Sequence, residues 1–256
     1  MAIPPVLKML KLAAAGFFAY SVLAIVVALV HPLNFRTADR SSAKIAPTPE
    51  QEPRAVVLVY KATAFSWRGW FSIHTWIAVK DKDAPSYEVM QVIGWRLREG
   101  LSPVMVEPDL PDRRWFGNEP SLLLELRGKE AEAVIVKIRK AAAAYPYRDS
   151  YRAWPGPNSN TFISFILRSV PELGIALPPN AIGRDWLVNG RILSRSESGT
   201  GFQLSLLGLA GVTVGLRDGV EVQLLGLDFG FDVLRPALKF PLIGRVGMRT
   251  ASPRSS

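Results

Sequence analysis

Apolar and polar positions divide the chain into an apolar N-terminal run, a mixed central part and a glycine-punctuated C-terminal part. The run from Leu12 to Val30 is uncharged over roughly the 20 positions that a helix needs to cross a bilayer. Lys8 and Lys11 precede it, which predicts a cytoplasmic N-terminus. A cleaved signal peptide would have a shorter apolar stretch, and a core helix would need a protein shell. The pattern favours a transmembrane signal anchor over residues 1–33.

The central part begins with a linker and alternates between strand and helix patterns. Residues 34–54 mix proline, serine and charges, which is typical of an extended linker. Ala55–Tyr60 and Ser121–Arg127 are short runs rich in apolar residues, as in buried strands. Lys129–Ala144 has apolar residues at helical spacing, with acids near its start and bases toward its end. We expect a folded domain over residues 55–198.

One strand of this domain carries the histidine that we expect in the folded part. Phe71–Lys80 alternates so that His74 and Trp76 share one face. Tyr87–Trp95 has the pattern of the next strand, and the turn-rich residues between the two predict a hairpin. His74 is therefore expected near the middle of a small sheet.

A loop dense in aromatic residues and proline, Tyr145–Asn160, leads to a candidate helix. Asn158, Ser159 or Asn160 can cap a helix that ends near Val170, before Pro and Gly. The β-rich TFISFIL sequence in the same segment leaves a strand as the alternative.

Residues 199–256 change to short apolar runs separated by glycine. Asp218-Gly219 between alternating runs is a strong hairpin signal and predicts a C-terminal β layer. The uncharged stretch Ser198–Leu216 could be a second membrane span, but its polar residues and glycines favour strands.

Composition narrows the chemistry. The chain has 256 residues, 31 Lys and Arg against 22 Asp and Glu, a net charge of +9, two histidines and no cysteine. A disulfide and a cysteine nucleophile are excluded, and a zinc site is disfavoured. No nucleotide motif is present, so we predict no metal and no cofactor. The bases after Val233 favour a solvated tail, with attraction to anionic lipid as the functional alternative and nucleic acid as a weaker one. They are Arg235, Lys239, Arg245, Arg249 and Arg254.

Ser159 and His74 form the candidate catalytic pair. Ser159 would lie at a helix N-terminus, which favours developing negative charge, and His74 is the candidate base. The alternative is that Ser159 or Asn158 only caps the helix. The aromatic residues Trp76 and Trp154, with Asn158 and Asn160, are candidates for binding a ligand in a cleft beside His74.

The sequences AWPGPNSNTFI and LPPNAIGRDW, together with IHTWIAVK, resemble a bacterial membrane-anchored family of unknown function. This resemblance covers most of the part after the linker and implies no known activity.

The order of His74 and Asn158-Ser159-Asn160-Thr161-Phe162 is also similar to permuted papain-like hydrolases, the NlpC-type amidases and lecithin:retinol acyltransferase relatives. In those proteins a histidine on an early strand precedes a cysteine that starts a helix. Ser159 matches the cysteine position and Phe162 its aromatic neighbour. A serine is far less acidic than a thiol, so the likeness supports the fold more than the activity. Glu88 or Gln91 on the next strand are candidates for a third residue.

Together these patterns predict an α+β protein: an N-terminal transmembrane helix, a permuted papain-like domain and a C-terminal β extension. The predicted location is the inner membrane, single-pass, with the domain facing the periplasm. The favoured function is a non-catalytic binding or scaffold module for a cell-wall or lipid ligand. The alternative is a Ser-His hydrolase or acyl/peptidyl transferase. The predicted partner is the lipid bilayer, without nucleic acid.

Overall fold

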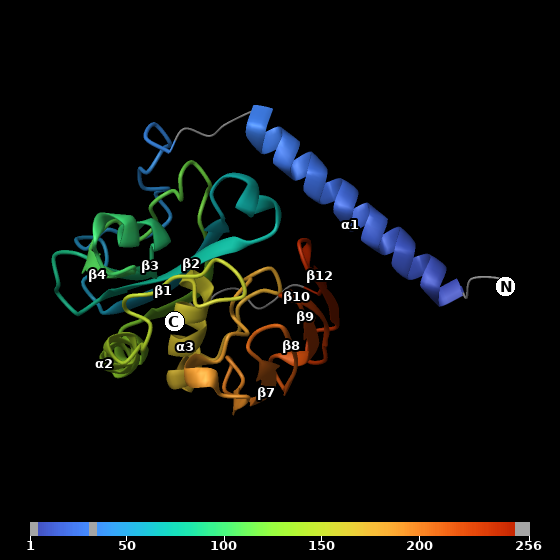
Figure 1. Ribbon diagram of the computed structural model, residues 1–256. Helices are drawn as coiled ribbons and strands as arrows, with labels where there is room; N and C mark the ends of the chain where they lie inside the picture. The colour runs from blue at the N-terminus through green and yellow to red at the C-terminus, as the bar shows by residue number, and fades with distance from the viewer. Residues whose placement is uncertain (1–4, 31–34, 249–256) are drawn as a thin grey trace.

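The computed structural model describes residues 5–30 and 35–248, which form two antiparallel sheets, three α-helices and short 3-10 helices (Figure 1). The α-helices are α1 (Pro5–Val30), α2 (Lys129–Ala143) and α3 (Ser159–Ser169), and the 3-10 helices are η1 (Ser66–Trp70), η2 (Gly94–Glu99), η3 (Pro171–Leu173) and η4 (Val188–Gly190). The first sheet contains β1 (Val56–Thr63), β2 (Ile73–Lys80), β3 (Glu88–Val92), β4 (Val104–Pro108) and β5 (Ser121–Arg127). The second contains β6 (Leu193–Arg195), β7 (Gly201–Leu206), β8 (Ala210–Gly215), β9 (Gly219–Leu224), β10 (Leu227–Asp232), β11 (Ala237–Phe240) and β12 (Gly244–Gly247).

The first sheet has the strand order β4-β3-β2-β1-β5, so β2 is its central strand, and β2 and β3 pair as predicted. Helices α2 and α3 pack on one face of this sheet. The main core lies between them and includes Val57, Ile77, Ile138 and Ile166. Burying aliphatic side chains of this kind contributes about 1.5–3 kcal/mol each.

Local patterns explain the two helices of this layer. The apolar positions of α2 are its buried face, as its sequence spacing predicted. Helix α3 begins at a capping box, in which the Asn158 side chain accepts bonds from the backbone of Thr161 and the Thr161 hydroxyl accepts one from Asn158 N–H. The helical prediction for this segment is confirmed, and the strand alternative was wrong.

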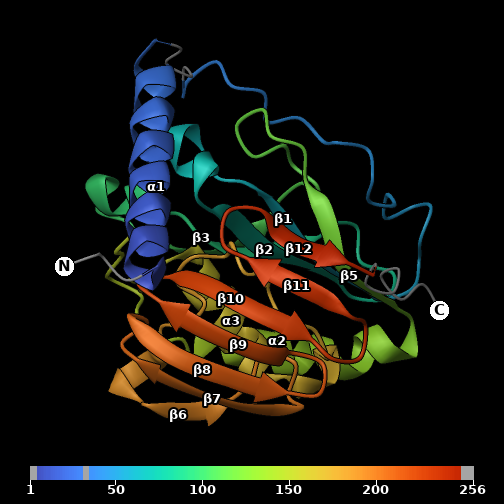
Figure 2. The same ribbon diagram turned by 90° about the vertical axis from the view of Figure 1, so that its right-hand side faces the viewer.

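The second sheet runs in chain order from β12 to β6, with tight turns between neighbours. The predicted Asp218-Gly219 turn joins β8 to β9, and Ser198–Leu216 includes strands β7 and β8. Its alternation is inverted: the face toward the rest of the protein is polar, and the opposite face is apolar and exposed. Figure 2 shows the strands of this sheet in front of α2 and α3. Lys239, predicted in a solvated tail, is buried on the inner face.

The prediction of a transmembrane signal anchor, and of a single-pass inner-membrane protein, was wrong. Within 5–30 and 35–248, no helix combines the length and sustained apolar character that a bilayer span requires. Side chains of α1 instead contact the domain: Tyr20 OH donates to the Trp70 carbonyl at 2.7 Å, and the Phe17 and Phe71 rings meet edge-on. Residues 1–4 of the predicted stub lie outside the described residues.

The predicted fold class was also wrong. Two antiparallel sheets dominate the chain, instead of an α+β permuted papain-like domain that follows a membrane helix. The physical reason is that glycine-punctuated alternation after residue 199 builds a large sheet, while only α2 and α3 cover the first sheet. Histidine–serine order along a chain does not fix the topology around it.

The predicted linker is attached to the first sheet's loops. The Asp112 carboxylate accepts bonds from the backbone N–H groups of Ile45 and Ala46 and from the Ser42 hydroxyl at 2.7 Å. These bonds lay residues 35–54 along the domain, because Asp112 is buried and its oxygens need donors.

Candidate functional site

A cleft of about 950 Å³ opens where α1, η1, η2, the start of α3 and the β9–β10 turn meet. We name it the aromatic cleft. Its walls are mainly aromatic and aliphatic, with few charges, as is common in sites for small organic molecules. Lining residues include Phe17, Phe35, Phe65, Trp67, Phe71, His74, Trp95, Trp115, Tyr151, Trp154, Ser159 and Leu225.

His74 lies on β2 in an almost fully buried position beside the cleft. Its ring stacks on Trp115 at a centroid distance of 3.6 Å and an interplanar angle of 11°. Its Nε2 atom is 2.9 Å from the Gln91 side-chain oxygen. Burial lowers the pKa of His74 to about 4, against a small opposing effect of the Gln91 bond. The imidazole is therefore neutral at neutral pH, and Gln91 orients it.

The structure brings Ser159 and His74 to one cleft but joins them to different neighbours. The opposite face of β2 contacts α3: Thr75 Oγ1 donates to Asn160 Oδ1 at 2.9 Å. Since successive strand residues point to opposite faces, His74 points away from the face that holds α3. Within the described part of the chain, no hydrogen bond links Ser159 to His74.

Both candidate asparagines are engaged by the backbone. Asn158 caps α3 and donates to the carbonyls of Ala153 and Ile182, each at 3.0 Å. Asn160 donates to the carbonyls of Ile73 and Ile182. These bonds tie β2, α3 and the segment around Ile182 together, so the polar atoms of both amides serve the architecture of the cleft floor.

The candidate tryptophans have different environments. Trp76 is buried, donates to the Pro111 carbonyl at 2.8 Å and stacks near His74, as their shared face predicted. It supports His74 from behind. Trp154 is 48% exposed, lines the cleft and donates to the Leu225 carbonyl at 3.0 Å. Only Trp154 of the two presents a ring to the cleft.

Sequence reasoning missed an aromatic cluster at one end of the cleft. The Phe35 and Phe116 rings stack at 5.2 Å, Phe65 lies 4.9 Å from Phe116, and the Arg40 guanidinium lies over Phe116 at 4.4 Å. Trp95 packs edge-on against Phe116. The dense aromatic segment 65–71 was the available signal, whereas Phe35 lay in the presumed linker.

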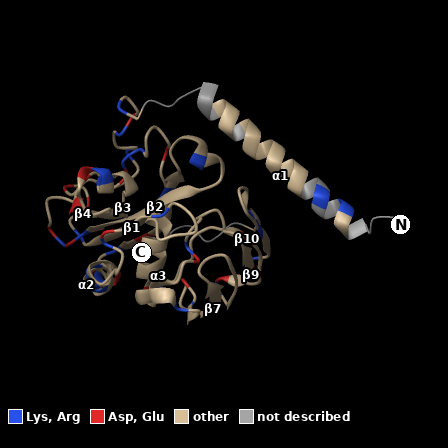
Figure 3. Ribbon diagram, in the orientation of Figure 1, with Lys and Arg blue, Asp and Glu red and all other residues tan. Residues whose placement is uncertain are grey.

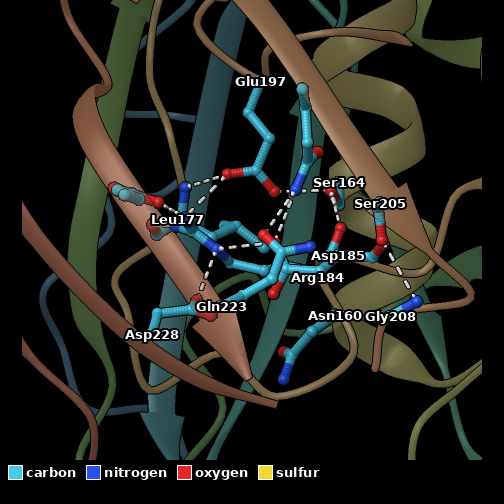
Figure 4. Close-up of polar contacts among 12 residues, drawn as sticks. Asn160, Ser164, Leu177, Arg184, Asp185, Glu197, Ser205, Gly208, Gln223 and Asp228 are labelled. Atoms are coloured by element: carbon cyan, nitrogen blue, oxygen red, sulfur yellow. Dashed lines mark hydrogen bonds and ion pairs between the residues drawn. The ribbon is translucent and has the colours of Figure 1, made fainter. Parts of the chain in front are cut away.

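We call residues 35–192, which include the first sheet, α2 and α3, the first domain. A buried ionic network joins this domain to the inner face of the second sheet (Figure 4). Arg184 forms ion pairs with Glu221 and, at 3.0 Å, with Asp228, and it also donates to the Leu177 carbonyl. Burial opposes its charge, but Glu197, Asp228 and other acids hold the pKa of Arg184 above its usual value. Burial and nearby Asp185 raise the pKa of Asp228.

Sequence reasoning missed this network as well, although Arg184-Asp185 lies within the singled-out LPPNAIGRDW motif. The ionic network joins the first domain to the second sheet, because its charged side chains are buried and pair across the boundary between them. No cluster of three His, Asp or Glu side chains that could hold a metal occurs in 5–30 and 35–248.

Comparison with known proteins identifies the family and no activity. Neither the curated proteins nor the solved structures include a match to this chain. The model of one protein family does match the chain, over residues 54–186, which is just over half of its length. These residues include β1 to α3, His74, Ser159 and Arg184. The chain therefore belongs to the family described as "Protein of unknown function (DUF3750)".

Proposed function

We propose that this protein is a non-catalytic binding module that holds an apolar ligand, of the class of a lipid acyl chain, in the aromatic cleft. The observation that carries the proposal is a cleft of about 950 Å³ whose walls are aromatic and aliphatic. Such a volume falls in the range of small-molecule sites, which are mostly apolar with a few polar groups.

The polar side chains of the site support binding over reaction. His74 is stacked and bonded to Gln91, and Asn158 and Asn160 are bonded to backbone carbonyls. Groups held in this way keep the cleft in shape and leave its apolar wall to contact the ligand. Burial of acyl methylenes would stabilise the complex by about 0.8 kcal/mol each.

Fluorescent fatty-acid binding tests the proposal. Ala64 lines the cleft beside exposed Trp67, so Ala64→Phe should fill it and Trp67→Ala should remove contact area. We expect each change to weaken binding at least tenfold. Ala143→Phe is the matched control, because Ala143 is exposed on α2. Equal affinity in all four proteins would contradict the proposal.

A second candidate is hydrolysis or acyl transfer through Ser159 and His74. Both residues line the aromatic cleft, and Ser159 is at the N-terminus of α3, where backbone N–H groups stabilise negative charge. This reaction requires His74 to turn from Gln91 toward Ser159, since a general base needs hydrogen-bond reach of its nucleophile.

Turnover of amide and ester substrates distinguishes the two candidates. A binding module should show no turnover that Ser159→Ala removes, and Ser159→Ala should keep its fatty-acid affinity. Turnover that is lost in both Ser159→Ala and His74→Gln, with folding intact, would favour the second candidate.

A further inference from the structure

The exposed face of the second sheet is an apolar surface that the binding proposal does not use. We call it the outer face. Paired residues of an antiparallel sheet lie on the same face, so the register defines a row of side chains across six neighbouring strands. The row consists of Phe202, Val214, Val220, Phe231, Leu238 and Val246. All six are between 44% and 70% exposed.

The inner face shows that this inversion is built into the fold. The alternate positions, among them Gln203, Glu221 and Asp228, are buried and bonded to the first domain. If the sheet were turned over, Phe202 and Phe231 would be buried against the charged Arg184. The acidic side chains that now pair with Arg184 would be exposed to solvent. The outer face is therefore fixed as the exposed one, and exposed apolar patches of this extent mark interaction sites.

The charged side chains around the outer face indicate which kind of partner binds there. Between residues 191 and 248 all acidic side chains are buried: Glu197, Asp218, Glu221, Asp228 and Asp232. Arginines, in contrast, remain accessible at the border. Arg195 is exposed and pairs in register with Phe202, and Arg217 is exposed in the β8–β9 turn. Most residues of this sheet are uncharged, whereas both basic and acidic residues surround the first sheet (Figure 3).

We infer that the outer face docks on an anionic lipid surface. An apolar centre with accessible arginines at its border matches the acyl region and the negative headgroups of such a surface. A second copy of the chain fits less well, because two outer faces would bring arginines together without an accessible carboxylate to pair with them.

Continuity with the aromatic cleft supports this occupant. Leu225 and Leu227 of the β9–β10 hairpin line the cleft together with Phe17 and Ile25 of α1. Helix α1 extends away from both sheets in Figure 1, and Ile25 is 50% exposed. The β9–β10 hairpin therefore belongs both to the second sheet and to the wall of the cleft. The docking inference rests on the outer face alone and does not require the proposed ligand.

A site-specific label tests docking, because the chain has no cysteine. Val222 lies on the outer face and is 52% exposed, so Val222→Cys can carry a bimane fluorophore. Vesicles of phosphatidylcholine with phosphatidylglycerol should shift its emission to shorter wavelength. The matched control is Val136→Cys on α2, where Val136 is 70% exposed and no shift is expected.

The charge dependence is tested in the same assay. Arg195→Gln combined with Arg217→Gln should weaken partitioning to anionic vesicles by about fivefold per arginine. Arg148→Gln, at an exposed position of the Tyr145–Asn160 loop, should change it little.

Two results would overturn the inference. If the protein sediments with vesicles while the Val222 label does not shift, another part of the chain makes the contact. If the label shifts without vesicles, in proportion to protein concentration, the outer face binds a second copy.

Discussion

His74 is a neutral imidazole held between Trp115 and Gln91, and its burial has a consequence for stability against pH. Its pKa is about 4 in the folded protein, whereas an unperturbed histidine has a pKa of 6.5. Between these values the unfolded chain binds more protons, so the free energy of unfolding rises with pH. The contribution is complete above pH 6.5 and is lost as pH falls toward 4, by about 3 kcal/mol.

Urea unfolding of the wild type and His74→Gln at pH 7, 5.5 and 4.5 measures this effect. The variant should lose stability less steeply over that interval, because glutamine does not titrate. Parallel pH profiles would show that His74 is accessible to protons in the folded protein.

Arg184 is the residue whose loss we expect to cost most. Arg184→Met leaves Asp228 buried without its cation, and leaves Glu221 with Lys239 alone and Glu197 with Arg168 alone, which should lower the free energy of unfolding by about 3–5 kcal/mol. Arg139 is the matched control: it pairs with Asp81 and Glu88 at the surface, so Arg139→Met should cost at most about 1 kcal/mol. Similar costs in urea titrations would contradict the assigned role.

At the residue scale, sequence alternation correctly placed His74 and Trp76 on one face of a strand. The same alternation puts Thr75 on the other face, but only the structure shows that α3 packs there. Arg184 could not be assigned a role, because two of its acidic partners, Glu221 and Asp228, lie 37 and 44 residues along the chain and their pairing is tertiary.

Among the elements, α3 depends most on a single side chain. Asn158→Ala removes the cap and two bonds to backbone carbonyls, so we expect a loss of at least about 1–2 kcal/mol in the free energy of unfolding. Ser159→Ala should cost little, since the cap bonds come from Asn158. Thermal and urea unfolding of both variants measure this difference, and a larger cost for Ser159→Ala would reassign the cap.

Elements with a strong local period were predictable. The strand Ser121–Arg127 and the helix that begins at Lys129 follow the sequence patterns almost residue for residue. Helix α1 was predicted as a helix by the same reasoning, but its assignment as a membrane span was wrong. Apolar composition does not show that its aromatic rings contact Trp70 at the end of η1 and Phe71 directly after it.

At the scale of the whole molecule, the ionic network should make the two sheets unfold together. All seven tryptophans lie between residues 67 and 186, so their fluorescence reports the first domain, and a label on Val222→Cys reports the second sheet. We expect coincident urea transitions by the two probes. In Arg184→Met the label should report unfolding at lower urea than tryptophan. Separate transitions in the parent protein would contradict this coupling.

The overall architecture was the least predictable level. The C-terminal strands and the turn at Asp218 were read correctly, but a period of two is the same whichever face turns inward. In most sheets the apolar face is buried. In this sheet the polar face is buried, because its acidic side chains pair with Arg184.

That reversal also guards the alignment of the strands. If β9 slipped by one residue against its neighbours, Glu221 would turn to the solvent and Val220 or Val222 would face Arg184. In a sheet whose inner face is apolar, a slip of two residues exchanges one aliphatic side chain for another and costs little free energy. Here a slip of one residue or of two residues separates Glu221 from Arg184. The ionic network therefore stabilises a single strand register.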